Sequence, residues 1–278
     1  MTGYARRLGM ALATVTGLDR QGYFIPCRHA GVFPAIAGYQ VVERLFASHL
    51  ESFCEVITDL EQFRDDLKAI GHDDPAPGPR WNQDWFPRLD AAVLYAMVRR
   101  WQPSRIVEIG SGHSTRFMAR AIADGAVSTR LVAIDPEPRA RLPVHGVTWM
   151  QDMLHDADPA VVEDLGKGDM LFIDSSHVAM PGSDVDELFN RIVPDLPVGV
   201  IVHVHDIFLP FGYPRAWDWR GYNEQLVVAP MLTGGSWTPL FASHYMTRRH
   251  PDRLETGVLG DIPLLPGAIE TSLWMTRS

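Results

Sequence analysis

The sequence predicts an α/β fold in which a mostly parallel, seven-stranded sheet is covered by helices and follows an N-terminal helical segment. After residue 104, short apolar strands alternate with helical stretches, and strands that are apolar on both faces are typical of a parallel sheet buried between helices. The predicted strands are Ile106–Ile109, Arg130–Ile134, Val147–Met150, Met170–Ile173, Val198–Val204, Pro239–Ser243 and Thr271–Thr276, of which the last two are expected to form an antiparallel closing pair.

Residues 1–79 are predicted to form a helical cap or oligomerisation segment. Apolar side chains recur every three to four positions between Val41 and Leu60, which is the spacing of an amphipathic helix. The stretch His72–Pro79 (HDDPAPGP) holds three prolines and a glycine, and these interrupt any regular element. We therefore expect a boundary here, a helix at Arg88–Trp101 and a second domain at residues 80–278.

The composition excludes several classes of protein. The 278 residues carry 25 basic and 34 acidic side chains, a net charge of −9, which disfavours nucleic acids and acidic membranes as partners. No apolar run approaches the length of a membrane span. Leu8–Leu18 follows two arginines but contains two Thr and two Gly, so we expect no signal peptide. The two cysteines, Cys27 and Cys54, form no disulfide framework, and a cytoplasmic location is expected.

The first motif, Ile106–Thr115 (IVEIGSGHST), is a buried strand followed by a glycine-rich turn and the start of a helix. Gly110 permits a tight turn, Gly112 lets a ligand approach the backbone, and the helix N-terminus offers unpaired N–H groups. Asp135 ends the next predicted strand, 23 residues after Gly112, where a carboxylate can accept both hydroxyls of a ribose. These features predict a site for a nucleoside-type ligand.

The ligand at this turn is either a dinucleotide or S-adenosylmethionine. A dinucleotide fingerprint has a third glycine where this chain has Thr115, and Glu108 would repel a pyrophosphate, whereas it suits the cationic amino acid part of S-adenosylmethionine. The segment resembles the E-x-G-x-G motif of class I S-adenosylmethionine-dependent methyltransferases, which have a Rossmann-like fold. This resemblance implies that Asp135 binds the ribose and Asp152 the adenine. The residues expected to bind the cofactor are Glu108, Gly110, Ser111, Gly112, Ser114, Asp135, Asp152 and Asp174.

The second motif places carboxylates and imidazoles at the ends of the fourth and fifth strands. GDMLFIDSSHV delivers Asp174 and His177, and VGVIVHVHDIF delivers His203, His205 and Asp206. Because the carboxyl ends of parallel strands form one crevice, these groups are expected to gather near the cofactor. Such convergence suits a divalent ion or an acid–base pair. A strand histidine also commonly packs and bonds a neighbouring group, and His203 is assigned this structural role.

The spacing of the second motif resembles that of the metal-dependent sugar O-methyltransferases of macrolide biosynthesis. The resemblance implies that Asp174, His205 and Asp206 hold a divalent metal and that His177 accepts the proton of a hydroxyl. His205 replaces a carboxylate of that family, and imidazole suits Mn²⁺ or Fe²⁺ better than Mg²⁺. Asp174, His177 and His205 are thus the expected catalytic residues, and the metal itself remains an open question at this point.

The segment Phe208–Gln225 (FLPFGYPRAWDWRGYNEQ) is rich in aromatic side chains and directly follows Asp206. It is expected either to stack on the acceptor substrate or to pack against the N-terminal helices. The residues expected to contact the acceptor are Trp217, Tyr222, Asn223 and Glu224. The segment Gly22–Ala30 (GYFIPCRHA) is interpreted as structural packing, with an acceptor lid and a dimer contact as alternatives.

The leading hypothesis is therefore O-methylation of a hydroxyl on a small molecule, a sugar or natural product, with S-adenosylmethionine as donor. The absence of an Asn/Asp-Pro-Pro-aromatic sequence after the fourth strand weighs against methylation of amino groups. Two alternatives stay open: a nicotinamide-dependent oxidoreductase, and a non-catalytic binding protein with the same fold. A homo-oligomer formed through the N-terminal helices is also expected.

Overall fold

The computed structural model describes residues 3–19, 21, 28 and 38–278. The chain divides into two compact units, Met1–Ala37 and Gly38–Ser278. The first unit contains helix α1 (Gly3–Thr16). Of the segment Gly22–Ala30, which was expected to serve as packing, an acceptor lid or a dimer contact, all residues except Arg28 lie outside the described residues. None of the helices in the described ranges is both long enough and apolar enough to span a bilayer.

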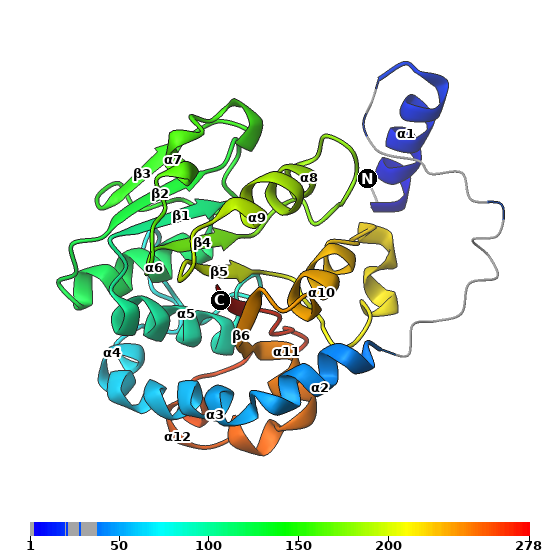
Figure 1. The fold of residues 1–278 in the computed structure, drawn as a ribbon. Coiled ribbons are helices and arrows are strands. Elements are labelled where there is room, and N and C mark those ends of the chain that lie inside the picture. Colours follow the sequence, from blue (N-terminus) through cyan, green and yellow to red (C-terminus); the bar gives the residue numbers. More distant parts are fainter. Residues whose placement is uncertain (1–2, 20, 22–27, 29–37) are drawn as a thin grey trace. The chain divides into compact units, whose positions relative to one another are not determined.

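The second unit is built on one seven-stranded sheet with the order β3-β2-β1-β4-β5-β7-β6 (Figure 1). Strands β1 to β5 are parallel, and β7 runs antiparallel to both β5 and β6. The strand order reverses between β1 and β4, which places a ligand crevice at their carboxyl ends. The strands are β1 (Arg105–Ile109), β2 (Arg130–Ile134), β3 (Val147–Met150), β4 (Met170–Ile173), β5 (Ile201–Val204), β6 (Trp237–Ala242) and β7 (Leu273–Arg277).

The predicted fold class and all seven predicted strands are confirmed, with local differences. Strand β5 begins three residues later than expected because Val200 N–H donates to the carbonyl of Pro197 and Gly199 has a positive φ, so these residues form a turn. Strand β3 was expected to be apolar on both faces, but it is the edge of the sheet and Trp149 is 45% exposed.

Helices cover both faces of the sheet, with α5 and α6 on one face and α8 and α9 on the other (Figure 1). Helix α5 has the predicted bounds, Arg88–Trp101, and its residues 89–98 are buried without interruption. The remaining helices are α2 (Gln40–Ser48), α3 (Leu50–Asp59), α4 (Arg64–Lys68), α6 (His113–Asp124), α7 (Ala160–Glu163), α8 (Asp184–Glu187), α9 (Val193–Asp195), α10 (Gln225–Thr233), α11 (Ser243–Arg249) and α12 (Gly257–Asp261), with short 3-10 turns η2 (Leu60–Phe63), η3 (Leu154–Asp156), η5 (Arg215–Arg220) and η6 (Pro251–Arg253) and one π turn, η4 (Leu188–Ile192).

Helices α2 to α4 belong to the same compact unit as the sheet, so the expected boundary at residue 79 does not coincide with the observed division at residue 37. Phe46 and Phe53 are fully buried, and their rings pack edge-on against Tyr245 and Phe241, which come from the C-terminal part of the chain. These long-range aromatic contacts join the helices to the sheet. The apolar spacing predicted the helices correctly but could not show what they pack against.

Candidate active site

A cavity of about 240 Å³ lies at the carboxyl ends of β1, β2 and β4. Five of the residues expected to bind the cofactor line this cavity, and we call it the cofactor cavity: Gly110, Ser111, Asp135, Asp152 and Asp174. It lies where the strand order reverses, which is the ligand position of doubly wound sheets. Carboxylates and backbone N–H groups around such a cavity suit the hydroxyls of a ribose and a cationic amino acid group.

Asp135 is held firmly at the rim of the cofactor cavity. One of its carboxylate oxygens accepts hydrogen bonds from the backbone N–H of Ser111 at 2.7 Å and from the Ser111 hydroxyl at 3.1 Å. The other oxygen accepts the backbone N–H of Glu137 at 2.8 Å. The carboxylate is therefore fixed by the glycine-rich turn before any ligand binds.

Glu108 does not line the cofactor cavity, although it was expected to face the cofactor. It is fully buried, and its two carboxylate oxygens accept hydrogen bonds from the hydroxyls of Ser114 at 2.5 Å and Thr115 at 2.6 Å. Thr115 in turn accepts the backbone N–H of Gly112 at 3.0 Å. Burial raises the pKa of Glu108 to about 8, and the two hydroxyls only partly oppose this effect. Glu108 and Ser114 thus fasten the glycine-rich turn to helix α6.

Gly110 is required by both conformation and space. Its φ is +77°, a region that L-residues rarely adopt, and a Cβ built on it would lie 2.0 Å from the backbone oxygen of Asp174. The turns after β1 and β4 therefore approach each other closely, and this approach brings Asp174 to the cofactor cavity.

A second cavity, of about 150 Å³, adjoins the first, and we call it the acceptor cavity. It shares the lining residues Asp174 and Arg139 with the cofactor cavity. The other residues that line it are Asp84, Trp85, His205, Asp206, Trp217, Arg220 and Gly267–Ile269. A molecule bound here would meet the cofactor across Asp174. Helices α2 to α4 line neither cavity, in contrast to the expectation that they cap the acceptor side.

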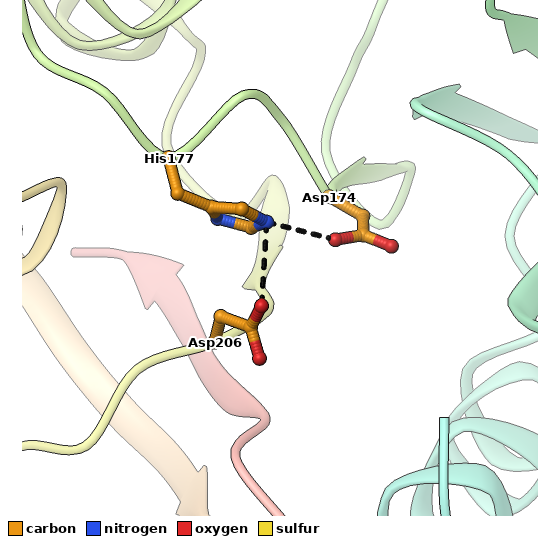
Figure 2. A group of neighbouring side chains, drawn as sticks. All are labelled: Asp174, His177 and Asp206. Carbon is orange, nitrogen blue, oxygen red and sulfur yellow. Dashed lines mark ion pairs between the residues drawn. The ribbon is translucent and has the colours of Figure 1, made fainter. Parts of the chain in front are cut away.

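Asp174, His177 and Asp206 converge on one point (Figure 2). Asp174 and Asp206 line the acceptor cavity, whereas His177 does not. Nε2 of His177 lies 3.2 Å from Oδ1 of Asp174 and 3.5 Å from Oδ2 of Asp206. Within the described ranges, these three residues form the one group of His, Cys or acidic side chains whose ligand atoms all lie close enough to share an ion. The expected metal set contained His205 in place of His177.

His205 lies on the other side of the same carboxylates. Its Nδ1 is 3.4 Å from Asp174 and 3.8 Å from Asp206, while its Nε2 faces Asp90 at 3.6 Å. Asp90 is fully buried and accepts the backbone N–H groups of Thr271 and Ser272 at 2.9 and 3.0 Å. A buried carboxylate therefore stands behind the imidazole of His205, on the side away from the acceptor cavity.

Burial and charge act in opposite directions on these imidazoles. Burial alone lowers the pKa of His177 and of His205, but the neighbouring carboxylates outweigh it and hold both well above the ordinary value. Burial likewise raises the pKa of Asp174, yet His205 and His177 reverse the shift and keep this carboxylate ionised. The cluster is therefore strongly coupled and charged.

Glu224 and Asn223 hold neighbouring backbone and side-chain groups in place and line neither cavity, although both were expected to contact the acceptor. Glu224 is fully buried and accepts hydrogen bonds from Nδ1 of His177 and from the hydroxyl of Ser175, each at 2.8 Å. The side chain of Asn223 bonds both the N–H and the carbonyl of Ala179. These contacts could not be predicted from the sequence, because residues 175–180 and 223–224 are distant in the chain and come together only when it folds.

The aromatic segment after β5 supplies one wall of the acceptor cavity. Trp217 lines it, whereas Tyr222 packs on the His177 ring with the ring centres 4.5 Å apart. The guanidinium of Arg220 lies 4.0 Å from the centre of the Trp217 ring and bonds the Tyr222 hydroxyl at 3.1 Å. Arg220 was not predicted as a site residue, and it makes no ion pair with a described carboxylate. A fixed cation over aromatic rings can hold a ring or an anionic group of an acceptor.

His203 belongs to the core, in the structural role assigned to it. Its ring stacks on Phe172 at 3.8 Å, and its Nε2 lies 2.8 Å from the Ser272 hydroxyl. Burial lowers its pKa well below the ordinary value, so it stays neutral.

Comparison with known proteins gives one family match. Residues 107–207 match a family described as a methyltransferase domain. No curated protein matches the chain. Among solved structures, the chain is similar to cmcI with Mg and SAM at 14% identity, covering 77% of this chain and 84% of that chain with a TM-score of 0.42.

Two further solved structures show similar values. The SAH-bound methyltransferase PaMTH1 of Podospora anserina is 13% identical, with coverage of 92% of this chain and 99% of that chain and a TM-score of 0.43. The plantazolicin methyltransferase BpumL, in complex with a pentazolic desmethylPZN analog and SAH, is 13% identical, with coverage of 81% and 99% and a TM-score of 0.43.

The matched residues run from strand β1 to the residue after Asp206 and include the glycine-rich turn, Asp135 and the convergent cluster. The cofactor cavity lies at the reversal of the strand order, inside this matched region. Residues 107–207 of this chain thus match a methyltransferase domain, and the cofactor cavity lies within the matched region.

Proposed function

We propose that the protein transfers the methyl group of S-adenosylmethionine to a hydroxyl of a small molecule. The observation that carries the proposal is that the cofactor cavity and the acceptor cavity share Asp174, beside a cluster of imidazoles and carboxylates. A sulfonium methyl is already activated, so the protein must align the attacking oxygen and remove its proton. A carboxylate–imidazole cluster at the junction of the cavities suits this task.

A divalent metal fits the same cluster. The donors are carboxylate oxygens of Asp174 and Asp206 and an imidazole nitrogen, a mixed set that favours Mn²⁺, Fe²⁺ or Zn²⁺ over Mg²⁺. When bound, such an ion lowers the pKa of a hydroxyl that it contacts and neutralises the carboxylates around it. We expected His205 as the nitrogen ligand and His177 as the proton acceptor.

The shape of the acceptor cavity supports a small, hydroxylated acceptor with a ring. Trp85 and Trp217 offer flat surfaces on its walls, and Arg220 offers a guanidinium that can bind an anionic substituent. The cluster at Asp174 and Asp206 lies on the same cavity, where it can receive the hydroxyl. Two observations disfavour a nicotinamide-dependent oxidoreductase. Residues 107–207 match a methyltransferase domain. The third glycine of a dinucleotide-binding fingerprint is replaced by Thr115, whose hydroxyl donates a hydrogen bond to Glu108.

The test is methyl transfer from ¹³C-methyl-labelled S-adenosylmethionine to a panel of hydroxylated aromatic acids and sugars, with Mn²⁺ present and after chelation. The expected products carry an O-methyl group, identified by NMR, and their formation requires the metal. Asp206→Asn should abolish turnover and bind S-adenosylhomocysteine as the chelated wild-type protein does, because Asp206 does not line the cofactor cavity. Transfer to nitrogen or carbon, or undiminished turnover in the chelated protein, would contradict the proposal.

A further inference from the structure

We propose that the two histidines exchange the roles expected of them: Asp174, His177 and Asp206 hold the divalent ion, and His205 accepts the proton of the acceptor hydroxyl. This inference rests on the proposed function, since it assigns roles within the same site.

The spacing around His177 is closer than that around His205 to the spacing of ligands on one ion. Atoms bound at about 2.1 Å and 90 to 110° apart lie about 3.0 to 3.4 Å from each other. Nε2 of His177 lies 3.2 Å from Asp174 and 3.5 Å from Asp206. The corresponding distances from Nδ1 of His205 are longer, 3.4 and 3.8 Å. His177 therefore completes the tighter set of donors.

The second nitrogen of His177 has the partner that a metal-bound imidazole usually has. A metal-ligating histidine typically donates its other N–H to a carboxylate, which fixes the ring and raises its basicity. Nδ1 of His177 lies 2.8 Å from Glu224, which is fully buried and is itself held by the Ser175 hydroxyl. Glu224 would keep one proton on Nδ1, so that Nε2, which faces the two carboxylates, would be the nitrogen that binds the ion.

The two imidazoles differ in their access to the acceptor cavity. His205 lines the acceptor cavity, whereas His177 lines neither cavity and its ring is covered by Tyr222. A proton acceptor must reach the hydroxyl, but a metal ligand need only reach the ion. Because Nε2 of His205 faces the buried Asp90, its Nδ1 is the nitrogen on the side of Asp174, where the cavities join.

The backbone holds His177 and Asp206 in an unusual conformation. Their φ angles are +60° and +55°, in the left-handed region that non-glycine residues rarely occupy. The carbonyl of His177 accepts the N–H groups of Asn223 at 3.0 Å and Glu224 at 3.2 Å, which fixes this conformation. His205 is an ordinary continuation of β5, with its N–H bonded to the Ile173 carbonyl. Within the cluster, the left-handed conformation therefore occurs at two of the three residues assigned to the ion.

The proposed reaction is balanced in atoms and electrons with S-adenosylmethionine as the methyl donor and His205 as the proton acceptor. Asp206 and Asp174 hold the pKa of His205 well above its ordinary value, and a bound divalent ion would offset their charge and leave Nδ1 of His205 unprotonated. The O–H bond of the acceptor then breaks, and its proton passes to Nδ1 of His205. The oxygen forms a bond to the methyl carbon of S-adenosylmethionine while the carbon–sulfur bond breaks, and its electron pair remains on sulfur. The products are the methyl ether, S-adenosylhomocysteine and a protonated His205, which Asp90 stabilises from behind.

The experiment measures Mn²⁺ binding by electron paramagnetic resonance in protein saturated with S-adenosylhomocysteine, so it does not depend on the acceptor. The variants are His177→Gln, His205→Gln and Glu224→Gln, and the matched control is His72→Gln, an exposed histidine paired with Asp73. We expect one Mn²⁺ per wild-type chain, at least about a tenfold weaker affinity in His177→Gln, and wild-type affinity in His205→Gln and the control. Glu224→Gln should weaken binding by about 10-fold, through the orientation of His177.

Loss of Mn²⁺ binding in His205→Gln with retention in His177→Gln would overturn the exchange and restore the roles first expected. Loss in both variants would also overturn it, since His205 would then be a ligand. Thermal unfolding of each variant shows whether a loss of binding is a loss of fold, and His177→Asn then serves as a second variant. If Mn²⁺ binds as expected but no hydroxyl is methylated, the proposed function fails while the metal assignment stands.

Discussion

Nδ1 of His177 lies 2.8 Å from a carboxylate oxygen of Glu224, although 47 residues separate the two in the chain. Both side chains are almost completely buried. This contact joins the turn after β4 to the start of α10, and it decides which way the imidazole faces. Its consequences for stability and for the site are measurable.

Replacing Glu224 should reveal a structural role in place of acceptor contact. Glu224→Ala leaves a buried imidazole without its partner, and we expect a loss of about 3 to 5 kcal/mol in the free energy of unfolding. Glu224→Gln keeps an acceptor oxygen and should cost less. Glu187→Ala, which breaks a partly exposed ion pair with Arg191 within one helical turn, is the matched control and should lower the free energy of unfolding by less than about 0.5 kcal/mol. Urea unfolding measures all three; equal costs for the two alanine variants would refute the buried role.

Asp135 should control cofactor affinity. Asp135→Asn loses the charge that the Ser111 and Glu137 N–H groups now stabilise, together with an acceptor for the ribose hydroxyls. We expect binding of S-adenosylhomocysteine to weaken at least about tenfold, or about 1.4 kcal/mol. Calorimetric titration measures this, with Asp252→Asn on the surface as control. Unchanged affinity would show that the ribose lies elsewhere.

Glu108 should impose a pH dependence on stability. Because burial raises its pKa to about 8, the folded protein keeps the proton while the unfolded chain, with a pKa near 4.5, releases it. Stability is therefore fully present below pH about 4.5 and falls by up to about 1.4 kcal/mol per pH unit as the pH rises toward 8. In urea unfolding between pH 5 and 8, Glu108→Gln should gain stability relative to wild type as the pH increases. Parallel curves for the two proteins would contradict the raised pKa.

Gly110 and Gly168 offer a matched pair, since both have positive φ but differ in their surroundings. A Cβ on Gly168 meets nothing within 4 Å, so Gly168→Ala should show only the cost of the left-handed conformation, about 1 to 2 kcal/mol. Gly110→Ala adds a clash with the Asp174 backbone at 2.0 Å, and we expect a clearly larger loss of stability together with weaker cofactor binding. Equal losses in urea unfolding would mean that the turns after β1 and β4 can separate freely.

Most strands and helices were predictable from the sequence, because their formation depends on the pattern of apolar and turn-forming residues within each segment. The strands at Arg130–Ile134 and Met170–Ile173 and the helix at Arg88–Trp101 have their predicted bounds, since each is an apolar or amphipathic run ended by a turn or a proline. The edge position of β3 was not predictable from Val147–Met150, because burial there depends on which strand lies beside it.

The candidate site was predictable to the extent that it lies at strand ends. Asp135, Asp174, His205 and Asp206 line the two cavities because each closely follows a strand of the parallel sheet. The partners behind the imidazoles were missed. Asp90 lies in the first turn of α5, where an acidic residue is ordinary, and its contact with the backbone of Thr271 exists only after the chain has folded.

The most direct test of the account is a calorimetric titration of the wild-type protein with S-adenosylhomocysteine, first after chelation and then with Mn²⁺ restored. The account predicts one binding site of micromolar affinity in both states and a tighter or more exothermic titration with Mn²⁺, because Asp174 borders both the cofactor cavity and the proposed metal cluster. Absence of binding in both states would contradict the cofactor assignment and, with it, the proposed methyl transfer.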